Sequence, residues 1–332
     1  MNKFKKILLV GATLICSTTM LTGCSESEVP KEKTKPDIKE HYLHIATGNT
    51  MGTYYIIGGA MSELLNEKIP DMHCAIQTTT GSIANVKLLA DDVVELAIIQ
   101  NDIASYAVNG SEMFKGENKY KFDKLRGLAT LYPESCQCVT TADSGINSIS
   151  DLRGKKVAVG AQDSGAEANA RQILEVYGLS YDDIQPMYMS FSAASKALKE
   201  GSIDAAFLTA GAPTLAVQDV ASQMNIKLLP IDDEHFKTLS EKYPFYSRNT
   251  IEKGTYRNFD EDVQTASVMA ILACNDKVDN DLANKVVKTI FDNLNTLKSA
   301  HPVITALDKN LAVEKSHMTI PFQEGAEKFF KE

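Results

Sequence analysis

A repeated alternation of short apolar runs with helix-like segments restricts this chain more than any other feature of its sequence. The alternation occurs twice, over residues 43–130 and 155–231. The strand-like runs are Leu43–Thr47, Cys74–Thr79, Leu96–Ile99, Val157–Val159, Pro186–Met189, Ala205–Leu208 and Ile226–Leu229. The helix-like segments begin at Gly52, Gly81, Gly165 and Ser192. Such alternation is typical of α/β proteins, so we expect a mainly parallel sheet with helices on both faces.

Two such repeats predict two α/β lobes. About 290 residues follow the N-terminal segment, which is enough chain for two packed lobes. An apolar strand over residues 266–273 and a long helix over residues 280–297 come after the second repeat. We expect residues 42–134 to form the first part of lobe 1, residues 135–262 to form lobe 2, and residues 263–332 to return to lobe 1. The expectation that the chain crosses between lobes more than once rests on analogy with hinged binding proteins.

The N-terminus indicates export from the cytoplasm. Lys3, Lys5 and Lys6 precede a short apolar run, which is followed by the tetrapeptide Leu21-Thr22-Gly23-Cys24. A basic start, a short apolar run and small residues before the cut are typical of a secretory signal peptide. The tetrapeptide resembles the bacterial lipobox, in which the cysteine is lipidated. We therefore predict a signal peptide over residues 1–23 and a lipid on Cys24 that anchors the protein to the outer side of the cell membrane.

The segment that follows Cys24 is polar and charged. Residues 24–41 include prolines at 30 and 36 and too few apolar side chains to offset the entropy of ordering them, so we expect a flexible tether. The whole chain carries a formal charge of −9, and removal of the three lysines of the signal peptide would take it to −12. That charge argues against nucleic acid or an anionic lipid surface as the main partner.

Four cysteines remain in the expected folded part, namely Cys74, Cys136, Cys138 and Cys274. Cys136 and Cys138 are two residues apart on one strand, which is poor geometry for a disulfide, and no second pair of ligands suggests zinc. Buried free thiols are the favoured interpretation, although the export context leaves a disulfide open.

Four turns rich in Gly, Ser and Thr lie where strands lead into helices. They are Gly48–Tyr54, Thr78–Ser82, Gly160–Ala166 and Thr209–Gly211. In open α/β sheets, ligands bind beyond the carboxyl ends of the strands. Helix N-termini attract anions, and hydroxyls donate hydrogen bonds without adding charge. The same residues also cap helices and form turns, but four such turns together favour one shared cleft.

These turns and their neighbours supply the candidate ligand-binding residues. They are Thr50, Thr53, Tyr54, Thr80, Gly81, Ser82, Asn85, Gln100, Tyr132, Ser164, Gly165, Ala166, Thr209 and Gly211. None of the five arginines of the chain lies in a turn, so we expect ligand carboxylates to be held by the helix N-termini at Gly81-Ser82 and at Ser164–Ala166. Tyr132 and Phe191 fit either a core position or a wall on which the ligand stacks.

Enzyme signatures are incomplete. There is no His-Glu-x-x-His motif, and Ala166 stands where a phosphate-binding loop needs lysine. Ser164 lacks the glycine at position 162 that a nucleophile elbow requires. Glu167 and Arg171 have the spacing of an ion pair on a helix face. We predict no catalytic residue, no metal site and no cofactor.

Six runs in order resemble one protein family. The runs are TGNTMGTYYIIGG, QTTTGSIANVKLL, LAIIQNDIASYA, LRGLATLYPE, DLRGKKVAVGAQDSGAEANARQIL and DAAFLTAGAPT. They are similar to the TAXI family of TRAP-transporter solute receptors, from about Leu43 to the C-terminal helix. The residues that match its turns are Thr50, Thr53, Tyr54, Thr80, Gly81, Ser82, Ser164, Gly165 and Gly211, whereas Asn49, Met51, Ile56 and Ala84 depart from it.

The resemblance implies a type II periplasmic-binding-protein fold, in which two α/β lobes are joined by a hinge with a ligand cleft between them. It implies a small acidic ligand, such as a glutamate-like amino acid or a dicarboxylate. It also implies a TRAP-type membrane permease that is driven by an ion gradient. Two other functions stay open, namely a ligand-sensing module that serves a signalling receptor and an extracytoplasmic enzyme on the same fold.

Overall fold

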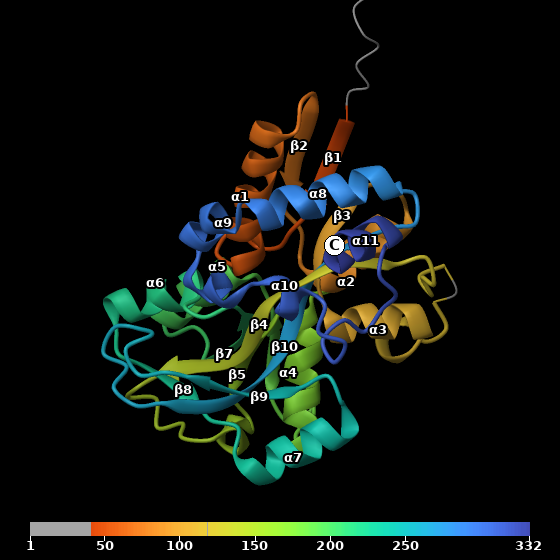
Figure 1. Ribbon diagram of the computed structural model, residues 1–332. Coiled ribbons are helices and arrows are strands. Elements are labelled where there is room, and N and C mark those ends of the chain that lie inside the picture. Colours follow the sequence, from red (N-terminus) through yellow and green to blue (C-terminus); the bar gives the residue numbers. More distant parts are fainter. Residues whose placement is uncertain (1–40, 118) are drawn as a thin grey trace, which may run out of the picture. The chain divides into compact units, whose positions relative to one another are not determined.

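The computed structural model describes residues 41–117 and 119–332 (Figure 1). The expected signal peptide, Cys24 and nearly all of the expected tether lie outside the described residues. His41, which the sequence assigned to the tether, is the first residue of strand β1.

Short strands alternate with helices along most of the chain. The strands are β1 (His41–Ala46), β2 (Met72–Gln77), β3 (Leu96–Gln100), β4 (Arg126–Thr141), β5 (Lys156–Gly160), β6 (Gln185–Tyr188), β7 (Ala205–Ala210), β8 (Ile226–Leu229), β9 (Ser247–Ile251) and β10 (Val263–Cys274). The α-helices are α1 (Thr53–Lys68), α2 (Ser82–Ala90), α3 (Asn101–Asn109), α4 (Gly165–Val176), α5 (Phe191–Lys199), α6 (Leu215–Gln223), α7 (Asp233–Lys242), α8 (Asn280–Asp292), α9 (Leu294–Ala300), α10 (Lys309–Ala312) and α11 (Glu324–Lys331). The 3-10 helices are η1 (Glu112–Phe114), η2 (Ile149–Leu152) and η3 (Pro302–Ala306).

The strands form a mixed sheet in the order β2-β1-β3-β10-β4-β7-β5-β6, with β8 beside β4 and β9 beside β10. Strand β1 pairs in parallel with β2 and β3, and β5 pairs in parallel with β6 and β7. Every pairing of β4 and β10 is antiparallel. The expectation of a mainly parallel sheet is therefore wrong for the centre of the sheet. There, β4 and β10 run antiparallel to each other and to their other neighbours, and they lie between the two parallel groups.

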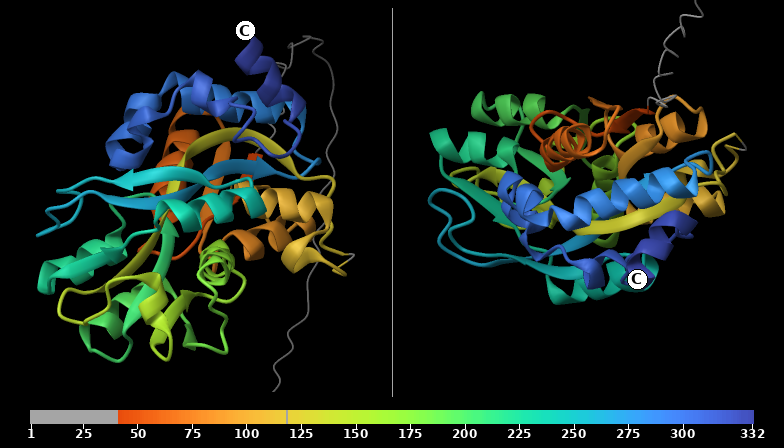
Figure 2. Two further views of the ribbon diagram at one scale, coloured as in Figure 1. Left: turned by 90° about the horizontal axis from the view of Figure 1, so that it is seen from below. Right: turned by 45° about the horizontal axis from the view of Figure 1, so that its top comes forward.

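Strands β4 and β10 belong to both halves of the sheet. Residues 126–135 of β4 pair with residues 267–274 of β10, and residues 135–141 of β4 pair with β7 and β8. Figure 1 shows the two strands between the β1–β3 group and the strands β5, β7 and β8, and Figure 2 shows them side by side from other directions. We call the β1–β3 half with α1–α3 and α8–α11 the first lobe, and the half with β5–β9 and α4–α7 the second lobe.

Helices cover both faces of each half of the sheet. In the first lobe, Ile57 of α1 and Val286 of α8 belong to one apolar cluster, and Val86 of α2 and Ile103 of α3 belong to another. In the second lobe, Ile173 of α4 belongs to one cluster, whereas Leu198 of α5 and Val217 of α6 belong to another. Each lobe therefore has its own core, as expected for a two-lobed α/β protein.

The long helix expected over residues 280–297 is two helices. Asn293 separates α8 from α9 with φ −123° and ψ 31°, which is outside the helical range. Its side chain donates to the carbonyl of Thr289 at 2.8 Å, an oxygen in the last turn of α8. An asparagine that bonds its own backbone favours a helix end, which the apolar periodicity alone did not indicate.

Two expected ligand-binding residues are part of the core. Asn85 is fully buried in α2, where its Nδ2 donates to the carbonyls of Thr47 at 2.7 Å and Ile98 at 2.8 Å. The side chain therefore ties α2 to β3 and to the residue after β1. Tyr132 is fully buried in the main cluster of the first lobe. Neither side chain lies in the pocket described below.

Replacing Asn85 should destabilise the protein. Asn85→Ala removes the Nδ2 donor to the Ile98 carbonyl and the Oδ1 acceptor of the Thr79 hydroxyl, and a buried polar group left without its partner costs about 1–3 kcal/mol. We expect the free energy of unfolding to fall by roughly 2–4 kcal/mol in a denaturant titration of the ligand-free protein. Asn284→Ala is the matched control, because Asn284 is half-buried and makes a single bond, to the carbonyl of Gly325. Equal stability of the two variants would contradict the assigned role.

Candidate ligand-binding cleft

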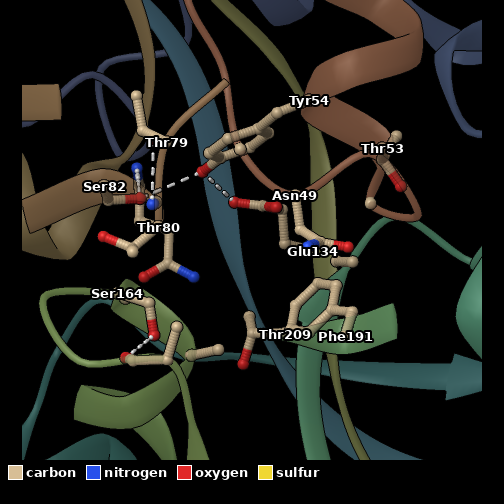
Figure 3. Close-up of a pocket in the computed structure, with 18 of the residues that line it drawn as sticks. Asn49, Thr53, Tyr54, Thr79, Thr80, Ser82, Glu134, Ser164, Phe191 and Thr209 are labelled. Atoms are coloured by element: carbon tan, nitrogen blue, oxygen red, sulfur yellow. Dashed lines mark hydrogen bonds between the residues drawn. The ribbon is translucent and has the colours of Figure 1, made fainter. Parts of the chain in front are cut away.

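A pocket with about 590 Å³ of space lies between residues of the two lobes. Its lining is Gly48, Asn49, Gly52, Thr53, Tyr54, Thr79, Thr80, Gly81, Ser82, Gln100, Glu134, Ala161, Ser164, Gly165, Ala166, Ser190, Phe191, Thr209 and Ala210 (Figure 3).

Five helices begin at this pocket. Their N-cap residues are Gly52 of α1, Gly81 of α2, Gln100 of α3, Ser164 of α4 and Ser190 of α5, and all five line it. Each of these helices is the next α-helix after a strand, so the pocket lies at carboxyl ends of strands. The N–H groups of a first helical turn have no partner within the helix and carry partial positive charge. The pocket is therefore electropositive without a cationic side chain.

Formal charge in the lining is confined to one residue. Among residues 41–117 and 119–332, no lysine, arginine or histidine lines the pocket, and Glu134 is its one acidic side chain. Arg171 lies outside the lining and contacts Glu167 at 3.4 Å, as the sequence predicted.

Two glycines allow the lobes to approach each other. Gly81 has φ +135°, a conformation that side chains with a Cβ rarely adopt, and an added Cβ would lie 3.2 Å from Cβ of Ser164. A Cβ on Gly165 would lie 1.8 Å from Oε1 of Gln100. The N-termini of α2 and α4 therefore meet across the cleft only because both positions are glycine.

A chain of hydrogen bonds leads from α3 to Glu134. The N–H of Gln100 donates to Oγ of Ser82 at 3.1 Å, and Ser82 Oγ lies 3.2 Å from the Tyr54 hydroxyl. That hydroxyl donates to Oε2 of Glu134 at 2.6 Å. Burial raises the pKa of the Glu134 carboxyl well above its usual value, and the hydrogen bond from Tyr54 opposes part of that rise.

Glu134 is the charged residue of the pocket lining that the sequence interpretation missed. It lies in the run LRGLATLYPE, one of the six runs that resemble the receptor family. A single acid within a 16-residue strand of mostly buried residues is the signal that could have identified it.

The serine hydroxyls have structural partners. Ser164 Oγ accepts from the N–H of Glu167 at 3.1 Å and donates to the carbonyl of Ala161 at 2.6 Å. Thr53 Oγ1 donates to the carbonyl of Gly211 at 3.0 Å. The hydroxyl of Thr80, by contrast, has no hydrogen-bond partner within the described part of the chain, which leaves it free for a ligand.

Most of the expected site residues come together here. The expected residues in the lining are Thr53, Tyr54, Thr80, Gly81, Ser82, Gln100, Ser164, Gly165, Ala166 and Thr209. Besides Asn85 and Tyr132, two more expected residues lie outside the lining. Thr50 is exposed in a turn, and the carbonyl of Gly211 accepts the hydrogen bond from Thr53. Phe191, which the sequence left open, is in the lining.

Polar contacts close the cleft. Nε2 of Gln100 donates to Oδ1 of Asn169 at 3.0 Å, and Nδ2 of Asn169 donates to Oδ2 of Asp102 at 3.0 Å. Burial raises the pKa of Asp102 to about 6. Elsewhere, Lys87 of α2 forms an ion pair of 2.9 Å with Asp163 of the second lobe. The structure is therefore that of the lobes in contact.

Other kinds of site have little support in the described chain. Within residues 41–117 and 119–332, no cluster of three His, Cys, Asp or Glu side chains could hold a metal ion. Over the same residues, no helix is both long and apolar enough to cross a bilayer. The cysteines Cys74, Cys136, Cys138 and Cys274 are buried and free.

Comparison with protein-family models gives the family. A model of the NMT1-like family matches residues 45–332, which is nearly all of the described chain. The chain belongs to the NMT1-like family.

Solved structures show the fold of this NMT1-like chain. The methylphosphonate complex of PhnD1 from Prochlorococcus marinus is 11% identical, with a TM-score of 0.53 over 80% of this chain and 90% of that one. The alkanesulfonate-binding protein SsuA from Xanthomonas axonopodis pv. citri, bound to MOPS, is 15% identical, with a TM-score of 0.50 over 89% and 84% of the two chains. The mixed α/β fold is therefore that of the periplasmic binding proteins, as the sequence resemblance implied.

Loss of Asn169 should open the cleft. Asn169→Ala removes the partner of Gln100 and the donor to Oδ2 of Asp102, and both of these bonds cross between the lobes, whereas the bond to Tyr246 lies within the second lobe. We expect a larger radius of gyration in solution scattering of the ligand-free protein, and ligand affinity at least about tenfold weaker. Asn109→Ala is the control, since Asn109 bonds within its own helix. If both variants match the wild type in radius and affinity, the contact does not hold the lobes together.

Proposed function

We propose that this chain is an extracytoplasmic solute-binding receptor rather than an enzyme. It captures a small acidic metabolite, either a glutamate-like amino acid or a dicarboxylate, and delivers it to a TRAP-type secondary transporter. The observation that carries this proposal is the ring of five helix N-termini around a pocket whose described lining has no cationic side chain.

An acidic ligand suits the electrostatics of this pocket. Helix N-termini stabilise anions through partial charges and oriented N–H groups, and several of them act on the same volume here. The hydroxyls of Ser82 and Ser164 are occupied by protein partners. The ligand carboxylate is therefore met mainly by backbone N–H groups, to which Thr80 adds a free hydroxyl.

A receptor role suits the two lobes and the cleft between them. A ligand that bridges the N-termini of α2 and α4 contacts both lobes and so binds the closed form better than the open form. Assignment of the partner as a TRAP-type permease rests on the sequence runs that resemble the TAXI receptors. The described pocket lining contains no histidine, cysteine or lysine to act as a base or nucleophile, which supports binding rather than turnover.

A carboxylate should bind far better than its uncharged amide. We propose to titrate the ligand-free protein by calorimetry with dicarboxylates, amino acids and the carboxamide of each. Because a hydrogen bond to a charged group is worth about 1.5–3 kcal/mol, the acid should bind at least about tenfold more tightly than its amide. Thr80→Val should weaken acid binding about tenfold, and Arg171→Gln should leave it unchanged. Equal binding of acids and amides, or loss of binding in Arg171→Gln, would refute the assignment of the site.

Anchoring by a lipid has a separate test. Cys24 lies outside the described residues, and its role rests on the Leu-Thr-Gly-Cys tetrapeptide. A single acyl chain holds a protein only marginally, so we expect a diacylated cysteine. Cys24→Ala should move the protein from the membrane fraction to the soluble fraction, whereas Cys16→Ala, a matched change inside the expected signal peptide, should leave it with the membrane. Identical fractionation of the two variants would contradict the anchor.

A further inference from the structure

Five buried polar side chains form a continuous series of hydrogen bonds across the contact between the lobes. Gln100 and Tyr106 belong to the first lobe, and Asn169, Gln172 and Tyr246 belong to the second. None of the five is more than 5% exposed. The bonds between Gln100 and Asn169 and between Gln172 and Tyr106 cross from one lobe to the other. We call this set of five side chains the relay.

Every bond of the relay points in the same direction. Nε2 of Gln100 donates to Oδ1 of Asn169 at 3.0 Å, and Nδ2 of Asn169 donates to the Tyr246 hydroxyl at 2.8 Å. That hydroxyl donates to Oε1 of Gln172 at 2.7 Å, and Nε2 of Gln172 donates to the Tyr106 hydroxyl at 3.1 Å. Oε1 of Gln100 receives no hydrogen bond. Because amides and hydroxyls both donate and accept, the same side chains can also bond in the opposite direction.

The Asp102 carboxyl determines which direction the relay takes. It is fully buried, its Oδ1 accepts from the N–H of Ile103 at 2.8 Å, and its Oδ2 accepts from Nδ2 of Asn169 at 3.0 Å. Both oxygens therefore face N–H donors, which suits an ionised carboxylate because it only accepts. A proton on Oδ2 would meet the N–H of Asn169.

Reversal of the relay accommodates that proton. When the amides of Asn169 and Gln100 turn over, Oδ1 of Asn169 accepts from the protonated Asp102, and Nδ2 of Asn169 donates to Oε1 of Gln100. The reversed relay therefore gives the Gln100 oxygen the donor that it lacks when Asp102 is ionised. Gln100 lines the pocket, so the direction of the relay also decides which end of its amide lies against Gly165 there.

We propose that Asp102 is a proton switch for closure of the lobes: the closed form binds a proton at this carboxyl more tightly than the open form does, and the proton reverses the relay. The proton comes from solvent and returns to it when the lobes open. This inference goes beyond the proposed function and does not depend on the identity of the ligand.

Burial between the lobes is the physical cause of the difference in proton affinity. Desolvation raises the pKa of Asp102 to about 6, the bonds from Ile103 and Asn169 oppose the rise, and no cation within residues 41–117 and 119–332 contributes to it. The titratable groups that face Asp102 are Tyr106 of α3, Glu134 and Cys136 of β4, and Tyr246 before β9. Opening withdraws Asn169 and admits water, which returns the pKa toward the ordinary value of about 3.9.

The sign of the pH dependence follows from the raised pKa. The proton favours closure fully below the pKa of the open form, and this contribution is lost as pH rises through the pKa of the closed form. With pKa values of about 3.9 and about 6, the equilibrium constant for closure should fall about tenfold between pH 5 and pH 7.

Carbon NMR of the mature chain with labelled aspartate carboxyls tests the proton affinity. The resonance that is lost in Asp102→Asn belongs to Asp102, and its midpoint should be about 6 in the wild type and at least about 1 unit lower in Asn169→Ala. The direction is diagnostic, because loss of the donor without opening would raise the midpoint instead. The side-chain amide resonance of Gln100, assigned by its loss in Gln100→Ala, should change with the same midpoint. An Asp102 midpoint near 4 in the wild type, a midpoint that does not fall in Asn169→Ala, or a Gln100 amide that ignores pH would contradict the switch.

Solution scattering of the ligand-free protein at pH 5 and pH 7.5 tests the coupling to closure. The radius of gyration should be larger at pH 7.5 in the wild type and in the control Asp123→Asn, since Asp123 is exposed before β4. Asp102→Asn mimics the protonated carboxyl and should keep the smaller radius at both pH values. The inference is wrong if the wild type keeps one radius, if Asp102→Asn responds to pH as the wild type does, or if Glu134→Gln removes the response and Asp102→Asn does not.

Discussion

The antiparallel pairing of β4 with β10 is the constraint on which the rest of the structure depends. Strand β10 pairs with β3 of the first lobe and with β9 of the second, and β4 pairs with β10 and with β7 and β8 of the second lobe. The two strands therefore connect the lobes. The pairing has register shifts between Ala270 and Ile271 and between Leu272 and Ala273, where the ladder is irregular.

The same connection places the helix N-termini around one volume. Strands β1 to β3 approach the pocket from the first lobe, and β5 and β6 approach it from the second, so the turns that follow them meet. Five helix N-termini then contribute partial positive charge to a pocket without a cationic side chain in its described lining. The electropositive site contains one opposite feature, the Glu134 carboxyl from the connecting strand β4, and this contrast gives the site two chemically different ends.

Local periodicity was enough to find the parallel groups of strands and the turns that form the pocket. Gly81, Ser82, Ser164 and Gly165 could be identified because several turns rich in glycine and hydroxyl residues occur where strands lead into helices. Asn85 has the same chemical type as a ligand-binding residue, but it bonds the backbone of neighbouring strands, and only the packing of α2 on β1 and β3 reveals that. Glu134 was missed for the opposite reason, because a strand residue gives no local sign that it borders a pocket.

Local sequence patterns established the α/β class, the two repeats, the helix starts that line the pocket and the resemblance to a receptor family. These are properties of neighbouring residues, and hydrophobic period, glycine and capping chemistry express them directly. Tertiary structure alone decided that Asn169 reaches Gln100 and Asp102, that Ser164 is occupied by its own turn, and that Glu134 lies in the pocket. Some of those contacts join residues that are far apart in the chain. Others depend on which of several acceptors receives a hydrogen bond from a given donor. No local sequence pattern contains either kind of information.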